Sequence, residues 1–264
     1  MASLRFSVDH EALRPQFAGL GPETRETTMN SRYSPPNECL SCHLRGGNFF
    51  CALSRTSIKA LNEIKLGAAF PEGVVILAEG QTPRGVFMLC QGQAKLSITA
   101  KDGKTFILRI AKPGEVLGLH AVVSGRPYEM TVETMQPCLL NLVSRDNFLR
   151  FLNDHSDACL HALQHISRDY QTACDALRSV GLTHSISERL AKFLLESSAD
   201  GKVANGVVRT KLTLTHEEIS QLVGTTRETI TRLLSDFRKR ELAELRGSTL
   251  VIHNKPALER LIAS

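Results

Sequence analysis

The sequence predicts an α+β protein in which a small antiparallel β-roll is followed by a long helix and a C-terminal winged helix-turn-helix. In the first half, short strand-like segments are separated by regularly spaced glycines, which is typical of a sandwich or roll. In the middle, apolar residues recur with a helical spacing. Near the C-terminus, short amphipathic helices flank a glycine, as in a helix-turn-helix.

The composition excludes several classes of protein. Hydrophobic residues make up 42% and charged residues 22% of the 264 residues, which is enough apolar material for packed cores. No apolar run approaches the roughly 20 residues of a membrane helix, so we expect no membrane partner. The N-terminus, with Asp9, Glu11 and Arg14, lacks the layout of a signal peptide, and we expect a cytoplasmic protein. The net charge of +5 is too small to identify a nucleic-acid binder by itself.

The predicted roll is marked by its turns. Glycines lie eleven or twelve residues apart at Gly80, Gly92, Gly103 and Gly114. Leu96 and Ile98 alternate with polar residues, which predicts a strand with one buried and one exposed face. Asp102-Gly103 is a strong signal for the hairpin turn after this strand. A further strand is predicted over 138–143.

A long helix is predicted after Ser156, which can cap its N-terminus. Its apolar residues recur at intervals of 3, 4, 3, 4 and 3, which matches the a and d positions of a coiled coil. The residues of this predicted dimer seam are Leu163, Ile166, Tyr170, Ala173, Leu177 and Val180. A helix that packs only on its own domain needs the same stripe. Because the pattern spans so few heptads, this second interpretation stays open.

The predicted helix-turn-helix begins with a capping box. The Thr215 side chain can accept from the amide of Glu218, whose carboxylate can accept from the amide of Thr215. This first helix ends at Gly224, and Thr226 can cap the N-terminus of the second. The segment 245–252 then predicts a β-hairpin, the wing of the domain.

The second of these helices has two chemically different faces. An apolar stripe must face the domain core, and it consists of Ile230, Leu233, Leu234 and Phe237. Arginine can donate two hydrogen bonds to guanine, glutamate can accept one from cytosine, and threonine can contact the methyl group of thymine. The predicted DNA-contacting residues are those of the opposite face and of the turn: Arg227, Glu228, Thr231, Arg232, Thr225 and Thr226. The alternative is a solvated face with a Glu228–Arg232 ion pair.

The segment 223–234, Val-Gly-Thr-Thr-Arg-Glu-Thr-Ile-Thr-Arg-Leu-Leu, closely resembles the recognition helix of the Crp/Fnr family of bacterial transcription regulators. The resemblance covers about residues 56–264. It implies a homodimer that is joined by the long helix and reads two half-sites of double-stranded DNA. The outward residues are more similar to the catabolite-activator branch than to the Fnr branch, which implies a palindrome with TGTGA-like half-sites. RNA polymerase is a further expected partner.

The resemblance divides the chain into five expected parts. These are a flexible extension (1–38), a cysteine-rich segment (39–55), a β-roll sensor domain (56–148), a dimerisation helix (149–184) and a winged helix-turn-helix DNA-binding domain (185–264).

The roll resembles a cyclic-nucleotide-binding fold, but the ligand set of that branch is absent. The branch needs a glutamate for the ribose and an Arg-Ser or Arg-Thr pair for the phosphate. Leu119 stands where the glutamate is expected, and Arg126 is followed by Pro127-Tyr128. We therefore do not expect cyclic AMP as the ligand. A module that binds a cyclic nucleotide or another small ligand, with protein contacts only at its C-terminal helices, is the alternative function.

The chain has seven cysteines, and three of them lie within thirteen residues at Cys39, Cys42 and Cys51. An odd number does not indicate a disulfide framework. The spacing resembles the cluster motif of Fnr-type oxygen sensors, although the eight-residue gap before Cys51 is longer than in the best-known members. In those sensors a fourth ligand follows a Glu-Thr pair, and Glu133-Thr134 favours Cys138 over Cys90. The resemblance implies a [4Fe–4S] cluster that responds to oxygen or redox state.

Other interpretations of the cysteines stay open. Four thiolates can hold a structural zinc ion, or the thiols can be oxidised without any cofactor. Cys39-x2-Cys42-His43 also matches the haem attachment motif, but covalent attachment occurs outside the cytoplasm.

No enzyme activity is expected from this sequence. It contains no Walker loop, no G-x-S-x-G and no H-E-x-x-H motif. His161 and His165 have the spacing of metal ligands, but on the long helix we expect them to be polar surface residues.

Overall fold

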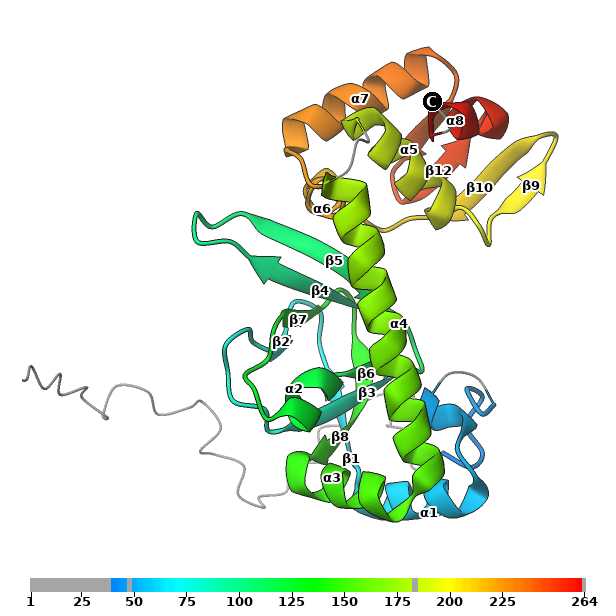
Figure 1. Cartoon of the computed structure of the whole chain (residues 1–264). Coiled ribbons are helices and arrows are strands. Elements are labelled where there is room, and N and C mark those ends of the chain that lie inside the picture. The colour runs from blue at the N-terminus through cyan, green and yellow to red at the C-terminus, as the bar shows by residue number, and fades with distance from the viewer. Residues whose placement is uncertain (1–38, 47–48, 182–184, 263–264) are drawn as a thin grey trace, which may run out of the picture. The chain divides into compact units, whose positions relative to one another are not determined.

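The computed structural model describes residues 39–46, 49–181 and 185–262, and Figure 1 shows the course of the chain through them. The expected extension over residues 1–38 lies outside the described residues. The described part contains the predicted antiparallel roll, the long helix and the C-terminal helix-turn-helix, so the α+β fold class is confirmed. No helix in this part combines the length and the apolar character needed to cross a membrane.

The strands of the roll form two antiparallel sheets of four. The sheet orders are β1-β8-β3-β6 and β2-β7-β4-β5. Their bounds are β1 (Leu66–Phe70), β2 (Val75–Leu77), β3 (Gly85–Gln91), β4 (Ala94–Thr99), β5 (Thr105–Ala111), β6 (Val116–Leu117), β7 (Thr131–Thr134) and β8 (Cys138–Ser144). Buried side chains such as Leu89, Leu96 and Leu140 fill the space inside, which we call the roll core.

One strand of the roll differs from its predicted pattern. Leu96 is buried as predicted, but Ile98 is 42% exposed and Ser97 is buried. The pairing of β4 with β5 shifts register between Leu96 and Ser97. A β-bulge reverses the faces of the residues beyond it, and no glycine or proline in this strand marks it in the sequence.

A second core, the helical core, lies between one face of the roll and short helices that pack on it. These helices are η2 (Phe49–Ala52), α1 (Arg55–Ile64), α2 (Leu119–Ser124) and α3 (Arg145–Asp154). The Phe50 and Phe148 rings meet edge to face with centroids 5.6 Å apart. Ala158 and Ala162, from the first turns of α4 (Ser156–Gly181), belong to the same core.

The long helix starts where its apolar spacing predicts, but later than the expected domain boundary. The expected boundary at residue 149 falls inside α3, and His155 then leaves the helical conformation with φ −128°. The long helix therefore begins at Ser156, as α4.

Part of the predicted dimer seam lies on an exposed face of α4. Leu163, Tyr170 and Leu177 are 60%, 68% and 72% exposed. Ile166 and Ala173 are half-buried, and the side chain of Val180 lies outside the described residues. Such large apolar side chains are unusual on the surface when they line one helix face, which favours a covering partner.

His165 is buried, contrary to the expectation of a surface residue. Its Nδ1 lies 3.0 Å from a carboxylate oxygen of Asp169, and Arg109 of β5 donates to the other at 3.4 Å. Burial alone would raise the pKa of Asp169, but the hydrogen bond and charge of His165 and the charge of Arg109 lower it. These contacts fix α4 against the roll.

The C-terminal domain is a winged helix-turn-helix with its own core. Leu190, Ile219 and Phe237 are fully buried in that core. The wing sheet has the order β11-β12-β10-β9, so it contains strands that precede the helix-turn-helix and were not predicted. The bounds are α5 (Ile186–Ser197), β9 (Lys202–Ala204), β10 (Val207–Lys211), α6 (His216–Val223), α7 (Arg227–Lys239), β11 (Ala243–Arg246), β12 (Thr249–Ile252) and α8 (Lys255–Ile262).

The start of α4 is tied to α1 by one carboxylate. Asp157 accepts hydrogen bonds from the Ser57 hydroxyl at 2.7 Å and from the Ser54 amide at 3.0 Å. Burial alone would raise the pKa of Asp157, but these hydrogen bonds lower it from 3.8 to about 2.

We expect the Asp157→Asn variant to have a lower free energy of unfolding at neutral pH, because the amide carries no charge to accept these bonds. A lowered native pKa stabilises the fold above the unfolded pKa, and this stabilisation is lost as the pH falls through the native value. The difference between wild type and variant should therefore shrink between about pH 4 and about pH 2 in urea unfolding. Asp175→Asn, at an exposed ion pair with Arg178, is the control. A difference that is independent of pH would contradict this account.

Candidate functional sites

The turn between α6 and α7 forms as the sequence predicts. Thr215 Oγ1 accepts from the amide of Glu218 at 3.1 Å, and the Glu218 carboxylate accepts from the amide of Thr215 at 2.9 Å. Gly224 ends α6 with φ +73°, a conformation that glycine adopts without strain. Thr226 Oγ1 caps α7 by accepting from the amide of Thr229.

The two faces of α7 are separated by burial. Ile230, Leu234 and Phe237 are buried, and Leu233 is half-buried. The predicted base-reading residues are exposed, and they line a shallow groove of about 600 Å³. The groove is lined by Arg227, Glu228, Thr231, Arg232, Ser235, Asp236 and Lys239. Thr225 and Thr226 stand in the turn ahead of it.

Two details of the exposed face bear on what it can bind. In the described part of the chain, Glu228 and Arg232 form no ion pair with each other, so the alternative of a simple surface pair gains no support. The Thr231 hydroxyl donates to the carbonyl of Arg227 at 2.9 Å and lies 3.0 Å from Nδ1 of His216. Because its hydroxyl is engaged within the protein, Thr231 can offer its methyl group to a base. His216, at the start of α6, is a neighbour of this face that sequence reasoning missed.

A second residue missed by sequence reasoning holds the turn. Arg189 of α5 donates from Nε to the carbonyl of Val223 at 2.8 Å and from its terminal nitrogen to that of Gly224 at 3.4 Å. These carbonyls end α6, where a positive charge is favourable. Its sequence signal is weak, because a lone arginine on a helix is usually a surface residue.

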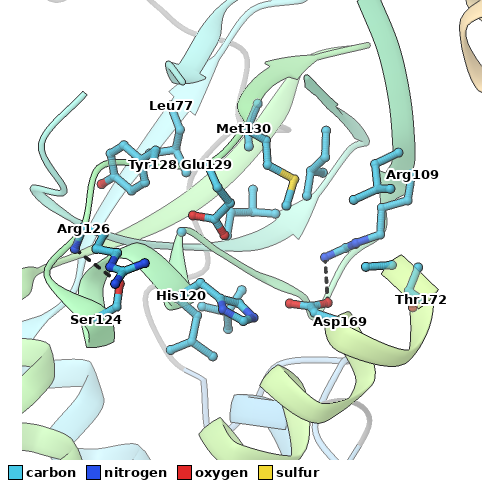
Figure 2. A pocket seen from close by; sticks show the side chains of 18 of the residues that line it. Leu77, Arg109, His120, Ser124, Arg126, Tyr128, Glu129, Met130, Asp169 and Thr172 are labelled. Carbon is cyan, nitrogen blue, oxygen red and sulfur yellow. Dashed lines mark hydrogen bonds and ion pairs between the residues drawn. The ribbon is translucent and has the colours of Figure 1, made fainter. Parts of the chain in front are cut away.

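The roll contains a pocket of about 690 Å³. Figure 2 shows Arg126 and Ser124 at one side, Arg109 and Asp169 at the other, and Glu129 between them. The walls are largely apolar side chains of the strands and of α4. Most natural small-molecule sites have this character, with a few polar groups on an apolar wall.

The pocket does not carry the expected cyclic-nucleotide residues at positions 119 and 127–128. Leu119 is buried among apolar side chains. The Tyr128 hydroxyl donates to the carbonyl of Gly85 at 2.8 Å and accepts from the amide of Arg84, so it is fully used within the roll. Arg109 is paired with Glu115 and Asp169.

The structure divides the predicted metal ligands. Cys39, Cys42 and Cys51 are half-buried. Cys39 and Cys42 lie close enough to Cys51 to interact with it electrostatically. Burial first, and then the neighbouring Cys42 and Cys39, raise the pKa of Cys51 to about 11. Cys138 is not with them: its Sγ is buried in the roll core and donates to the carbonyls of Gln93 and Gln136.

Cys90 lies near the three N-terminal cysteines. Burial first, and then Cys39, raise the pKa of Cys90 to about 12, and Cys42 and Cys51 also contribute. In the residues that the structure describes, no group of histidine, cysteine or acidic side chains is already arranged around a single metal ion.

Comparison with known proteins identifies the two domains. Residues 68–155 match the cyclic nucleotide-binding domain family, and residues 188–261 match the Crp-like helix-turn-helix domain family. The chain belongs to the Crp/Fnr family of transcription regulators. Regulators of this family bind DNA and act as dimers, and they are not a family of enzymes.

Relatives match over most of this Crp/Fnr chain. The CRP-like cAMP-activated global transcriptional regulator of Mycobacterium tuberculosis is 27% identical over 218 residues, 82% of this chain and 97% of that protein. The global nitrogen regulator of Synechocystis is 28% identical over 196 residues, 72% of this chain and 86% of that protein.

Solved structures share the fold. FixK2 from Bradyrhizobium japonicum has a TM-score of 0.66 at 22% identity, covering 76% of this chain and 98% of that one. A CooA mutant from Carboxydothermus hydrogenoformans has a TM-score of 0.69 at 19% identity, covering 81% and 95%.

We expect Arg189→Ala to lower the free energy of unfolding by about 1–3 kcal/mol, since it removes charged hydrogen bonds to two carbonyls. Hydrogen exchange of the amides in and after the α6–α7 turn should accelerate. Lys192→Ala on the same helix removes only an exposed pair at 4.0 Å and is the matched control. Equal effects of the two substitutions would show that Arg189 does not hold the turn.

Proposed function

We propose that this Crp/Fnr chain is a homodimeric regulator that binds a palindrome with TGTGA-like half-sites. The single observation that carries this proposal is the exposed face of α7, on which Arg227, Glu228 and Arg232 border one groove while the opposite stripe is anchored in the core. Arginine and glutamate on such a face match the guanines and cytosines of a TGTGA/TCACA half-site. RNA polymerase is the proposed protein partner, and the cytoplasm is the proposed compartment.

The dimer is proposed to form through α4. Leu163, Tyr170 and Leu177 leave an apolar row exposed along this helix, and a second copy of the helix would cover it. A two-fold dimer presents its two recognition helices about one DNA turn apart, which is the geometry that a palindrome requires.

We expect Arg227→Ala to weaken binding to the TGTGA palindrome by roughly 5- to 100-fold and to relax the preference for guanine at one position of each half-site. The physical reason is the loss of a two-donor contact to a base edge. Selection from random DNA with wild type and variant, followed by titration in a fluorescence anisotropy assay, measures both effects.

Arg238→Ala is the control for that experiment, because this arginine is exposed on α7 outside the groove. It should leave the selected sequence unchanged. If wild-type protein selected a motif without a G·C pair in each half-site, or if Arg227→Ala had no effect, the proposed contacts would be wrong.

The proposed signal is oxygen or redox state, sensed by a [4Fe–4S] cluster. Cys39, Cys42 and Cys51 are the proposed ligands from the N-terminal segment, with a fourth thiolate from the roll. The donor chemistry fits, because iron–sulfur clusters in proteins are held by cysteine thiolates. When bound, the cluster supplies sensitivity to oxygen. The role of the chain is to hold the thiolates together and to couple the segment to the helical core through Cys39 and Leu40.

Three alternatives compete with the cluster. A structural zinc ion or direct thiol oxidation would use the same cysteines. A small ligand in the 690 Å³ roll pocket is favoured by the size and apolar walls of that pocket, although Leu119 and Tyr128 argue against cyclic AMP.

We expect protein prepared without oxygen to be brown and to contain iron and acid-labile sulfide in similar amounts. Exposure to air should bleach it and weaken binding to the palindrome in a gel-shift assay, because the cluster is proposed to hold the DNA-binding form. A colourless protein with one tightly bound zinc per chain would replace the cluster with the zinc alternative.

A further inference from the structure

Strand β3 packs against both cores. Val86 and Met88 are buried in the helical core, whereas Leu89 is buried in the roll core. Alternation does not assign Cys90 to a face, because the pairing of β3 with β8 shifts register between Leu89 and Gln91, and Cys90 lies at that bulge. Cys39 of the N-terminal segment packs against that same helical core.

The neighbouring strand shows which core Cys90 faces. Val143 of β8 lies in the helical core, and Asn141, two residues before it, shares its face. The Asn141 side-chain nitrogen donates to Sγ of Cys90 at 3.1 Å. Asn141 is 1% exposed, so this donor is buried and aimed at the sulfur.

Cys138 lies on the other face of the same strand. It shares that face with Leu140, and both belong to the roll core. Cys138 is 1% exposed, and its Sγ donates to two backbone carbonyls. The same sulfur would lie 2.5 Å from a Cβ atom built on Gly92. This tight packing leaves no space for a cluster beside Cys138.

The positively charged side chain of Lys65 lies beside these cysteine thiols. Lys65 follows α1, and its Nζ donates to Sγ of Cys39 at 3.0 Å. The Lys65 charge also opposes the rise in the pKa of Cys90, which otherwise comes from burial and from the other thiols. The backbone of Cys39 is held in turn, because its amide donates to the Asn62 side chain at 3.3 Å.

We propose that Cys90, and not Cys138, supplies the fourth thiolate beside Cys39, Cys42 and Cys51, and that Lys65 and Asn141 donate hydrogen bonds to the bound sulfurs. This inference rests on the proposed cluster site and changes its ligand set. On binding, each thiol releases its proton to solvent and its sulfur forms a bond to iron, with no change in the oxidation state of the cysteine. Hydrogen bonds to the sulfurs of such a cluster raise its reduction potential.

The decisive experiment compares two single variants of the full chain. Cys90→Ser and Cys138→Ser are reconstituted without oxygen from ferrous iron and sulfide, and iron, sulfide and visible absorbance are measured. Cys159→Ser, at an exposed position on α4, is the matched control. We expect Cys90→Ser to lose most of its bound iron and sulfide, and the other two variants to retain wild-type levels. Circular dichroism of each protein before reconstitution checks its fold.

The opposite result would overturn the proposal. If Cys138→Ser lost the cluster and Cys90→Ser kept it, the proposed oxygen sensor would stand while the ligand assignment here would fail. If the wild-type protein bound no iron and sulfide at all, the proposal of a cluster would be wrong. The proposal that α7 binds DNA would be unaffected.

A cofactor-free measurement tests the placement separately. In variants that retain only Cys39 with Cys90, or only Cys39 with Cys138, a short bifunctional thiol reagent should cross-link the first pair and not the second. Cross-linking of Cys39 to Cys138 alone would place the N-terminal segment against the other face and contradict the inference. Lys65→Ala should keep the cluster but shift its reduction potential to a more negative value, which a purely structural role of this lysine would not do.

Discussion

The burial of one apolar stripe on α7 holds the proposed recognition surface in place. Ile230 and Phe237 are fully buried, and each such side chain contributes about 1.5–3 kcal/mol when removed from water. The stripe fixes the rotation of α7 about its axis, so the direction of Arg227 and Arg232 is a consequence of core packing. Arg189 adds a second restraint at the turn, through carbonyls that helix geometry leaves without partners.

Features with a short-range physical cause could be predicted from the sequence. The capping box at Thr215 and Glu218, the left-handed Gly224 and the faces of α7 all depend on residues within one or two helical turns. Features that depend on distant partners could not be predicted from the sequence. The bulge after Leu96, the burial of His165 against Asp169 and the early strands of the wing sheet all arise from neighbours far away in the sequence.

The choice of a fourth cysteine for the proposed cluster site shows the same limit of sequence-based prediction. A motif of Glu-Thr followed by cysteine favoured Cys138, because a linear pattern records spacing and not the side of a sheet. The structure adds the surroundings of each sulfur: Cys138 lies in the roll core, whereas Cys90 accepts a hydrogen bond from Asn141. Where neighbouring strands can both offer a ligand, a linear pattern alone does not choose between them.

The helical core gives the thiol segment a mechanical connection to the long helix. Cys39 and Leu40 pack on the same core as Ala158 and Ala162, the small side chains in the first turns of α4. Alanines allow close approach of a helix but have no rotamers with which to absorb a displacement. A change of volume at the cysteines would therefore be passed to the axis of α4 as a rigid tilt. Its far end, some twenty residues on, would swing through a larger arc than its base.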